Sequence, residues 1–269
     1  MLMFRARFKG EILAGFLPPA RTAEGKVRKE RSRRGREATA EKERAIVLCD
    51  GMPSIPRKQP LAEFLAARGY WMFYPRYRGA WESGGEFLEH SPHLDILDVI
   101  DGLRGEIREL AFGRRFRVRA DEIFVIGGSF GGAAAILCSL DDRVKKVIAN
   151  CPVVDWGILR ESEKAETSNP NYAAYIRAAF GMAFRLSDRN WKKLHGGTFF
   201  NPIYHADEVT PSKVMMFHAQ DDPNVPYKSV VHFAKLTSVK LKLLRRGGHL
   251  STDMVVRRYW REIEGFLRR

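Results

Sequence analysis

A serine stands in the middle of a glycine-rich segment, GGSFGG, which covers residues 127–132. The run before it, EIFVI, has the composition of a buried strand, and the run after it, AAAILCSL, that of a helix. A G-x-S-x-G motif between a strand and a helix is typical of a nucleophilic serine on a tight turn, where only small residues avoid a clash at Gly127 and Gly131. The N-terminus of the helix favours a developing oxyanion. We therefore predict that Ser129 is the nucleophile of an acyl transfer; the alternative is a serine that only caps the helix.

A nucleophilic serine needs a base, and the base needs an acid that fixes its tautomer. An acid follows the apolar run KVMMFHA, in the segment QDDPNVP, where Asp221 and Asp222 are both candidates. A histidine, His249, follows the next run, VKLKLLRR, after the pair Gly247 and Gly248. Both groups are expected at strand ends, so we predict His249 as the base; among the other histidines only His205 competes.

Short apolar runs alternate with amphipathic stretches along most of the chain. The runs begin at residues 45, 70, 122, 144, 213 and 239, and helices are expected over residues 61–68, 92–110, 131–140, 227–236 and 252–267. The opening FRARFKGEILAGFLPP alternates on either side of a Lys9-Gly10 turn and predicts a hairpin. This pattern predicts an α/β fold with a mostly parallel sheet covered by helices on both faces.

Two segments interrupt the alternation. Residues 157–210 are rich in aromatic side chains and too long for an unstructured loop, so we expect a helical cap insertion between core segments 1–156 and 211–269. Residues 21–44 hold ten basic and five acidic residues without apolar periodicity, which predicts a basic, solvated linker.

The formal net charge of +14 raises nucleic acid or an anionic membrane surface as partners. Part of the excess lies in the linker and no nucleic-acid-binding motif is present, so we expect neither partner. The cysteines Cys49, Cys138 and Cys151 lie in apolar runs without metal-ligand spacing and predict buried thiols in a reducing compartment. No signal-peptide pattern or long apolar window occurs, which predicts a cytoplasmic protein; abundant Arg and Glu hint at a thermophile.

The chain from about Ala45 onward resembles the α/β-hydrolase superfamily, in particular prolyl-oligopeptidase-like and dienelactone-hydrolase-like serine esterases. The segments that carry the resemblance are VLCDGMPS, LAEFLAARGYWMFYPRYRGAWESGGEF, GGSFGG, HAQDDPNVP and RGGHLS. It implies an α/β-hydrolase fold and a Ser-Asp-His triad. The related pattern H-G-x-x-D-x-x-V-P, laid on residues 218–226, selects Asp222 as the acid and leaves Asp221 in reserve.

The same resemblance implies an oxyanion hole made by the backbone N–H groups of Met52 and Phe130. The sequence departs from the related pattern there, because Asp50-Gly51 stands where His-Gly is usual. An ionised carboxylate beside an oxyanion would oppose catalysis, so we expect Asp50 to face away into a hydrogen-bonded turn.

Three functions are compatible with these residues. The first is an esterase that acts on a small acyl ester through an acyl-enzyme on Ser129, without metal or organic cofactor. The second is a peptidase acting on short peptides; related peptidases often carry a propeller domain, for which the first 44 residues are too few. The third is a non-catalytic binding protein of the same fold. The sequence leaves the oligomeric state open.

Other polar positions have structural interpretations. Arg76 and Arg78 could bind an acidic substrate, but arginines at a strand end more often make structural hydrogen bonds. Asp95, Asp98 and Asp101 recur every three residues in a predicted helix, which is typical of a solvated acidic face rather than a metal site.

Overall fold

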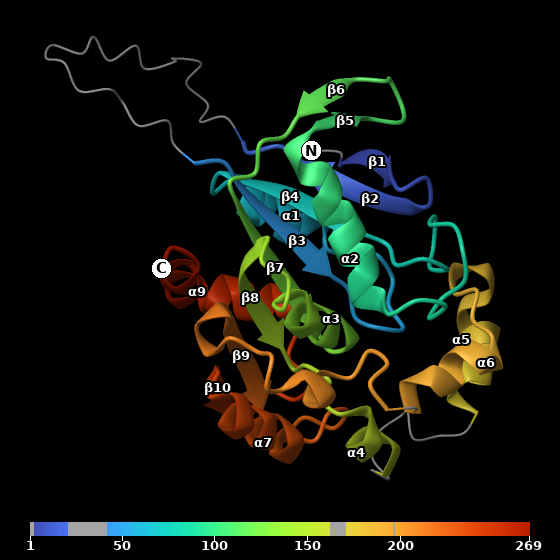
Figure 1. Ribbon diagram of the computed structural model, residues 1–269, viewed down its shortest axis with the longest axis vertical. Helices are drawn as coiled ribbons and strands as arrows, with labels where there is room; N and C mark the ends of the chain where they lie inside the picture. Colours follow the sequence, from blue (N-terminus) through green and yellow to red (C-terminus); the bar gives the residue numbers. More distant parts are fainter. Residues whose placement is uncertain (1–2, 21–41, 162–170, 196) are drawn as a thin grey trace, which may run out of the picture.

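A computed structural model (Figure 1) describes residues 3–20, 42–161, 171–195 and 197–269. Its centre is an eight-stranded sheet in the order β1-β2-β4-β3-β7-β8-β9-β10. The strands are β1 (Phe4–Phe8), β2 (Ile12–Leu17), β3 (Arg44–Cys49), β4 (Tyr70–Pro75), β7 (Glu122–Gly128), β8 (Val144–Asn150), β9 (Val214–Ala219) and β10 (Lys240–Leu244).

The sheet begins with an antiparallel hairpin and continues as a parallel sheet. Strand β1 pairs with β2 and β2 with β4 in antiparallel register, whereas all later neighbours are parallel. The predicted hairpin and the predicted α/β-hydrolase fold are both confirmed. The carboxyl ends of the parallel strands therefore meet at one edge of the sheet, where sites of open α/β sheets form.

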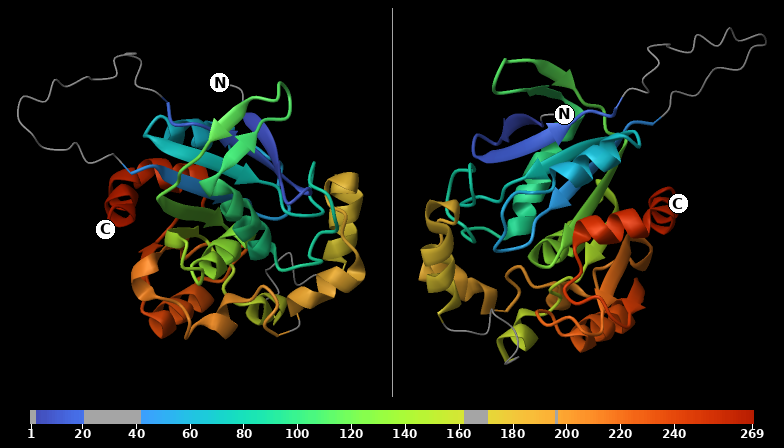
Figure 2. Two further views of the ribbon diagram at one scale, coloured as in Figure 1. Left: turned by 45° about the horizontal axis from the view of Figure 1, so that its top comes forward. Right: turned by 180° about the vertical axis from the view of Figure 1, so that it is seen from behind.

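Helices cover both faces of the sheet, as the alternation of apolar runs predicts (Figures 1 and 2). One apolar cluster joins one face to α2 (Pro92–Asp101), α3 (Phe130–Cys138) and α7 (Tyr227–Thr237). A second cluster joins the other face to α1 (Gln59–Ala66), α8 (Thr252–Arg258) and α9 (Trp260–Leu267). Strand β7 lies between them, with Val125 in the first cluster and Phe124 in the second.

The helix predicted over residues 92–110 is wrong beyond Asp101. A 3₁₀ turn (Gly102–Arg104) follows, and then the strands β5 (Glu106–Arg108) and β6 (Arg115–Arg117) form a separate hairpin. The ring of Phe116 packs 4.7 Å from Phe4 and 5.1 Å from Phe16, measured between centroids. Packing against the edge of the main sheet thus overrides the helical pattern.

The acidic face predicted for this helix is also wrong at Asp95, which is buried. Its carboxylate accepts a hydrogen bond from the backbone N–H of Arg78 at 2.8 Å and pairs with the guanidinium of the same residue. Arg78 also contacts Asp98 at 2.7 Å and Glu11 at 2.6 Å. Arg78 therefore joins α2 to the hairpin, and its predicted structural role is confirmed.

The helix predicted over residues 252–267 is interrupted at Tyr259, whose φ of −107° and ψ of 19° separate α8 from α9. The ring of Tyr259 stacks on Phe217 of β9 with centroids 5.4 Å apart. This contact turns the chain so that both short helices lie against the sheet.

The segment after β8 leaves the sheet and returns at β9. It contains α4 (Trp156–Glu161), α5 (Tyr172–Phe180), α6 (Asp188–Lys192) and 3₁₀ turns at Gly181–Ala183, Lys193–His195, Pro202–His205 and Pro211–Lys213. Helices α5 and α6 lie beside the loop that follows β4 (Figure 2), and the N–H of Phe87 donates to the carbonyl of Arg185 at 2.8 Å. The described part of this segment is thus partly helical.

Most of the predicted basic linker, residues 21–41, lies outside the described residues. Across the described ranges, none of the helices is long and apolar enough to cross a membrane.

Candidate active site

Ser129 lies between β7 and α3 in a backbone conformation that side-chain-bearing residues rarely adopt, with φ of 57° and ψ of −122°. The neighbouring glycines make this turn possible. A Cβ at Gly127 would lie 1.9 Å from the carbonyl oxygen of Gly131, and a Cβ at Gly131 would lie 2.4 Å from that of Asp50. The start of α3 therefore lies too close to β7 and to the end of β3 for any larger residue at these two positions, as the motif predicts.

His249 and Asp222 are hydrogen-bonded to each other, although they lie on loops after different strands. The Nδ1 atom of His249 is 2.9 Å from Oδ2 of Asp222 and 3.1 Å from Oδ1. The Asp222 side chain is fully buried, whereas a quarter of the His249 side chain is exposed. The two residues selected by the sequence are thus brought together.

The carboxylate of Asp222 is held in its ionised form. Burial opposes the charge, but hydrogen bonds from His249 and from the N–H groups of Val225 (3.0 Å) and Asn224 (2.8 Å) outweigh it, and the pKa of Asp222 lies below its usual value. An ionised acid of this kind fixes the proton of a histidine on Nδ1 and leaves Nε2 as a base.

The reserve candidate, Asp221, has a different position. Its Oδ1 accepts a hydrogen bond from the N–H of Gly248 at 2.8 Å, one residue before His249. Gly248 has a φ of 59°, which favours glycine. Asp221 therefore holds the histidine loop, and Asp222 holds the histidine itself.

Asn150, the last residue of β8, connects the serine turn to the histidine loop. Its carbonyl oxygen accepts the N–H of Ser129 at 2.8 Å, and its Nδ2 donates to the carbonyl of Leu250 at 2.6 Å. Asn150 is almost completely buried. No sequence motif selects Asn150. Its position at the end of a predicted strand, on the sheet edge that carries Ser129, could have indicated a role in the site.

Cys151 and His218 lie behind the Asp222 carboxylate. The Cys151 thiol is hydrogen-bonded to Asp222, and burial raises the pKa of this thiol. His218 is fully buried with its Nε2 atom 3.1 Å from the carbonyl of Val225. Ligand atoms of Cys151, His218 and Asp222 lie within 4.8 Å of one another. All three cysteines are buried and free, as predicted.

The loop after β3 packs against the serine turn. A Cβ at Gly51 would lie 3.7 Å from Cβ of Ser129 and 3.7 Å from the carbonyl oxygen of Gly128. Met52 follows in this loop, and Phe130 begins α3 directly after the serine. The oxyanion hole formed by their backbone N–H groups stays a prediction.

The Asp50 carboxylate is hydrogen-bonded, as predicted. Its Oδ1 lies 3.1 Å from the N–H of Gly51 and 3.2 Å from Nζ of Lys58, and its Oδ2 accepts a hydrogen bond from the hydroxyl of Tyr74. Tyr74 belongs to β4, whereas Ser129 follows β7, on the other side of β3. Asp50 is therefore directed toward β4 and neutralised by Lys58. Neither partner was identified from the sequence.

His205, the other candidate histidine, pairs with a residue outside this cluster. Its Nδ1 lies 2.7 Å from Oε1 of Glu208, three residues later on the same segment. This local pair accounts for its polar contact.

The chain is similar to known proteins in sequence and in fold. Residues 59–257 match the family model of the Prolyl oligopeptidase family. No curated protein sequence matches the chain.

Solved structures show the same fold. An esterase from Pyrococcus furiosus, Pf2001, is 15% identical with a TM-score of 0.64, over 99% of this chain and 90% of that one. Est1E from Butyrivibrio proteoclasticus, bound to ferulic acid, is 16% identical with a TM-score of 0.64, over 98% of this chain and 99% of that one. An acylaminoacyl peptidase from Pyrococcus horikoshii is 18% identical with a TM-score of 0.62, over 98% of this chain but only 40% of that one.

Proposed function

The chain belongs to the prolyl oligopeptidase family of serine hydrolases, and from this premise we propose that it cleaves carboxylic esters through an acyl-enzyme on Ser129. The observation that carries the proposal is the hydrogen-bonded pair of Asp222 and His249 at the sheet edge that also holds the strained Ser129 turn. Asp222 orients His249, and His249 takes the proton of the Ser129 hydroxyl.

In the first half-reaction, Oγ of Ser129 forms a bond to the acyl carbon and the proton passes to Nε2 of His249. The carbonyl oxygen becomes an oxyanion, which the N–H groups of Met52 and Phe130 stabilise. The tetrahedral intermediate then expels the alcohol, which receives the proton from His249. Water repeats the sequence on the acyl-enzyme and releases the acid. Every step uses groups of this chain and water, so we propose that no cofactor or metal takes part.

We further propose that residues 157–210 act as a cap over this site and favour an apolar acyl or aryl group. The support is aromatic packing between the cap and the turn: the ring of Phe130, next to Ser129, lies 4.6 Å from that of Phe200, measured between centroids. A cap that packs on the residue after the nucleophile shapes the space in front of it.

The preference for esters over peptides is supported by the extent of the structural likeness. The two esterases align over nearly their whole length, whereas the peptidase chain is more than twice as long as the part that aligns. Peptidase activity on short peptides is the second candidate, because the shared fold also carries that activity in the Pyrococcus horikoshii enzyme.

Parallel assays with short acyl esters, a feruloyl ester and aminoacyl-arylamide reporters test this proposal. We expect turnover of the esters with kcat/KM at least about tenfold above that of the arylamides, and no turnover by the Ser129→Ala variant. Faster arylamide cleavage would favour the peptidase. Ester cleavage that survives Ser129→Ala would contradict the assignment of the nucleophile.

A further inference from the structure

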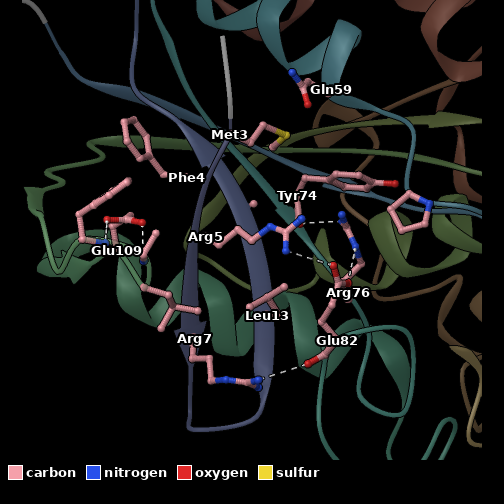
Figure 3. Close-up of a pocket in the computed structure, with 15 residues that line it drawn as sticks. Met3, Phe4, Arg5, Arg7, Leu13, Gln59, Tyr74, Arg76, Glu82 and Glu109 are labelled. Carbon is pink, nitrogen blue, oxygen red and sulfur yellow. Dashed lines mark hydrogen bonds and ion pairs between the residues drawn. The ribbon is translucent and has the colours of Figure 1, made fainter. Parts of the chain in front are cut away.

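A second cavity lies away from the serine cluster, at the antiparallel end of the sheet (Figure 3). Its volume is about 680 Å³, a size typical of small-molecule sites. The floor is formed by β1 and β2, one wall by Tyr74 and the loop after β3, and the other wall by the tip of the β5–β6 hairpin. Among its lining residues only Tyr74 touches the candidate active site, through its hydrogen bond to Asp50.

The cavity exists because no described helix covers this face of β1 and β2. Leu13 and Gly15 of β2 line it. The methyl group of Met3 occupies the space above Gly15, because a Cβ built on Gly15 would lie 2.9 Å from that methyl carbon. The hairpin tip adds Leu110 and Phe112, whose exposed fractions of 52% and 78% are high for apolar side chains. The cavity therefore offers a long apolar surface that stays in contact with water.

One end of the cavity carries an excess of positive charge. Arg5, Arg7 and Arg76 line it, together with the single nearby carboxylate of Glu82 (Figure 3). That carboxylate is 3.7 Å from Arg5 and 3.6 Å from Arg76, beyond hydrogen-bond distance for both. Arg7 uses the backbone carbonyls of Glu11 and Glu82.

The other acid of the lining, Glu109, is already engaged. Its carboxylate accepts the N–H groups of Ala111 and Phe112 in the hairpin tip, and these bonds lower its pKa although burial opposes the charge. It therefore leaves the arginines with donor capacity that no carboxylate of the lining fills.

Arg76 shows this spare capacity most directly. Its side chain is 12% exposed, with the guanidinium carbon 4.1 Å above the ring of Tyr74 and Nη1 bonded to the carbonyl of Tyr74 at 3.1 Å. Its Nε is buried, and Oε2 of Glu82 lies 3.6 Å from it, beyond hydrogen-bond distance. A fixed, stacked guanidinium that lines the cavity and has no carboxylate of the lining within hydrogen-bond distance is suited to a planar carboxylate.

We propose that this cavity binds an amphiphilic organic anion: a carboxylate head against Arg76 and Arg5, and an aliphatic body along Leu13, Met3 and the hairpin tip. The charge of the head complements the arginine excess, and the body covers the exposed Leu110 and Phe112. The site is separate from Ser129, so it takes its ligand whether or not the chain hydrolyses esters.

Calorimetric titration with decanoate tests the proposal, with decanol and acetate as probes that lack the head or the body. Because the proposed hydrolase could also hold decanoate as a product, the titrations use protein whose active site has been blocked with a fluorophosphonate, beside unblocked protein. We expect decanoate to bind both forms equally, and to bind at least about tenfold more tightly than either partial probe.

Arg76→Gln and Arg5→Gln should each weaken decanoate binding, Arg76→Gln by about tenfold. Arg115→Gln is the matched control. Arg115 lies in the β5–β6 hairpin, whose tip lines the cavity, but it does not line the cavity itself and pairs with Glu106 at 3.1 Å. Equal binding of decanol and decanoate, equal losses in all three variants, or loss of binding in the blocked enzyme would each overturn the proposal. The last result would instead place the ligand at Ser129 and support the proposed function.

Discussion

The two ends of strand β7 are built for different purposes. At its start, Glu122 contacts Arg44 of the neighbouring β3 at 2.9 Å and pairs with Lys145 of β8, so opposite charges join three adjacent strands. At its finish, the chain enters the strained Ser129 turn, where backbone groups and Asn150 hold the geometry. The ion pairs at the amino end of β7 thus stabilise the fold, whereas the strained backbone lies at its carboxyl end.

This difference indicates where substitutions should affect stability and where they should affect chemistry. Ion pairs at the amino edge form only in the folded state, so their loss should lower the free energy of unfolding. The hydrogen bonds at the carboxyl edge fix atoms that must meet a substrate, so their loss should appear in kcat before it appears in the melting temperature.

The largest effect is expected for Ser129→Ala. Because no other side chain replaces the nucleophile, ester turnover should fall by roughly 10⁵- to 10⁶-fold, while the melting temperature stays nearly constant. Ser139→Ala in the same helix–strand unit is the control and should retain activity, since the Ser139 hydroxyl bonds only the carbonyl of Ile136. A large loss of stability in Ser129→Ala would show that the carboxyl edge is structural after all.

The next effect is expected for Asp222→Asn. The amide would favour the wrong tautomer of His249, so kcat should fall by about 10⁴-fold with the fold retained. Asp221→Asn keeps an acceptor for the N–H of Gly248 and should change kcat by less than about tenfold. Equal losses in both variants would reject the distinction between the two acids.

A smaller loss is expected for Asn150→Ala. The variant keeps the backbone carbonyl that holds Ser129 but loses the Nδ2 bond to Leu250, so the histidine loop should shift and kcat should fall by about ten- to a hundredfold. KM should stay within about threefold, because the asparagine is a positioning residue. Asn190→Ala, which removes a buried amide from α6, is the control. An unchanged kcat in Asn150→Ala would show that the bond from Asn150 to Leu250 does not position the histidine loop.

The smallest effect on activity is expected at the amino edge. Burial opposes the charge of Glu122, but the bonds from Lys145 and Arg44 outweigh it and lower the pKa of Glu122 from 4.5 to about 2. A lowered pKa stabilises the folded protein above pH 4.5, and this contribution is lost as the pH falls toward 2.

Glu122→Gln should therefore lower the melting temperature at pH 7 and leave kcat unchanged. The difference from the unmodified protein should shrink when melting is followed from pH 5 down to the acid limit of the fold. Glu262→Gln, which removes a more exposed pair with Lys240 and Lys242, should have a smaller effect at every pH. A constant difference across the pH range would mean that the pairs of Glu122 are not its source.

The residues that follow local rules could be predicted from the sequence. The glycines around Ser129 and the alternating hairpin at the N-terminus carry their geometry in a few neighbouring positions. The β5–β6 hairpin and the break at Tyr259 could not be predicted, because Phe116 and Tyr259 are placed by rings distant in the sequence, those of Phe16 and Phe217.

The candidate site divides in the same way. Ser129, Asp222 and His249 stand in motifs, and the structure joins Asp222 to His249 directly; their catalytic roles remain predictions. Tyr74 donates a hydrogen bond to Asp50, Lys58 neutralises its charge, and Asn150 acts through one side-chain amide. No short sequence pattern predicts such residues, because their function depends on which strand ends become neighbours in the fold.

Reaction with a fluorophosphonate, followed by intact-mass and peptide mass spectrometry, tests directly whether Ser129 is an activated nucleophile. We expect one adduct per chain, located on Ser129, with much slower formation in Asp222→Asn and none in Ser129→Ala. A folded protein that never reacts, as a non-catalytic member of the fold would behave, or an adduct on another residue, would contradict it.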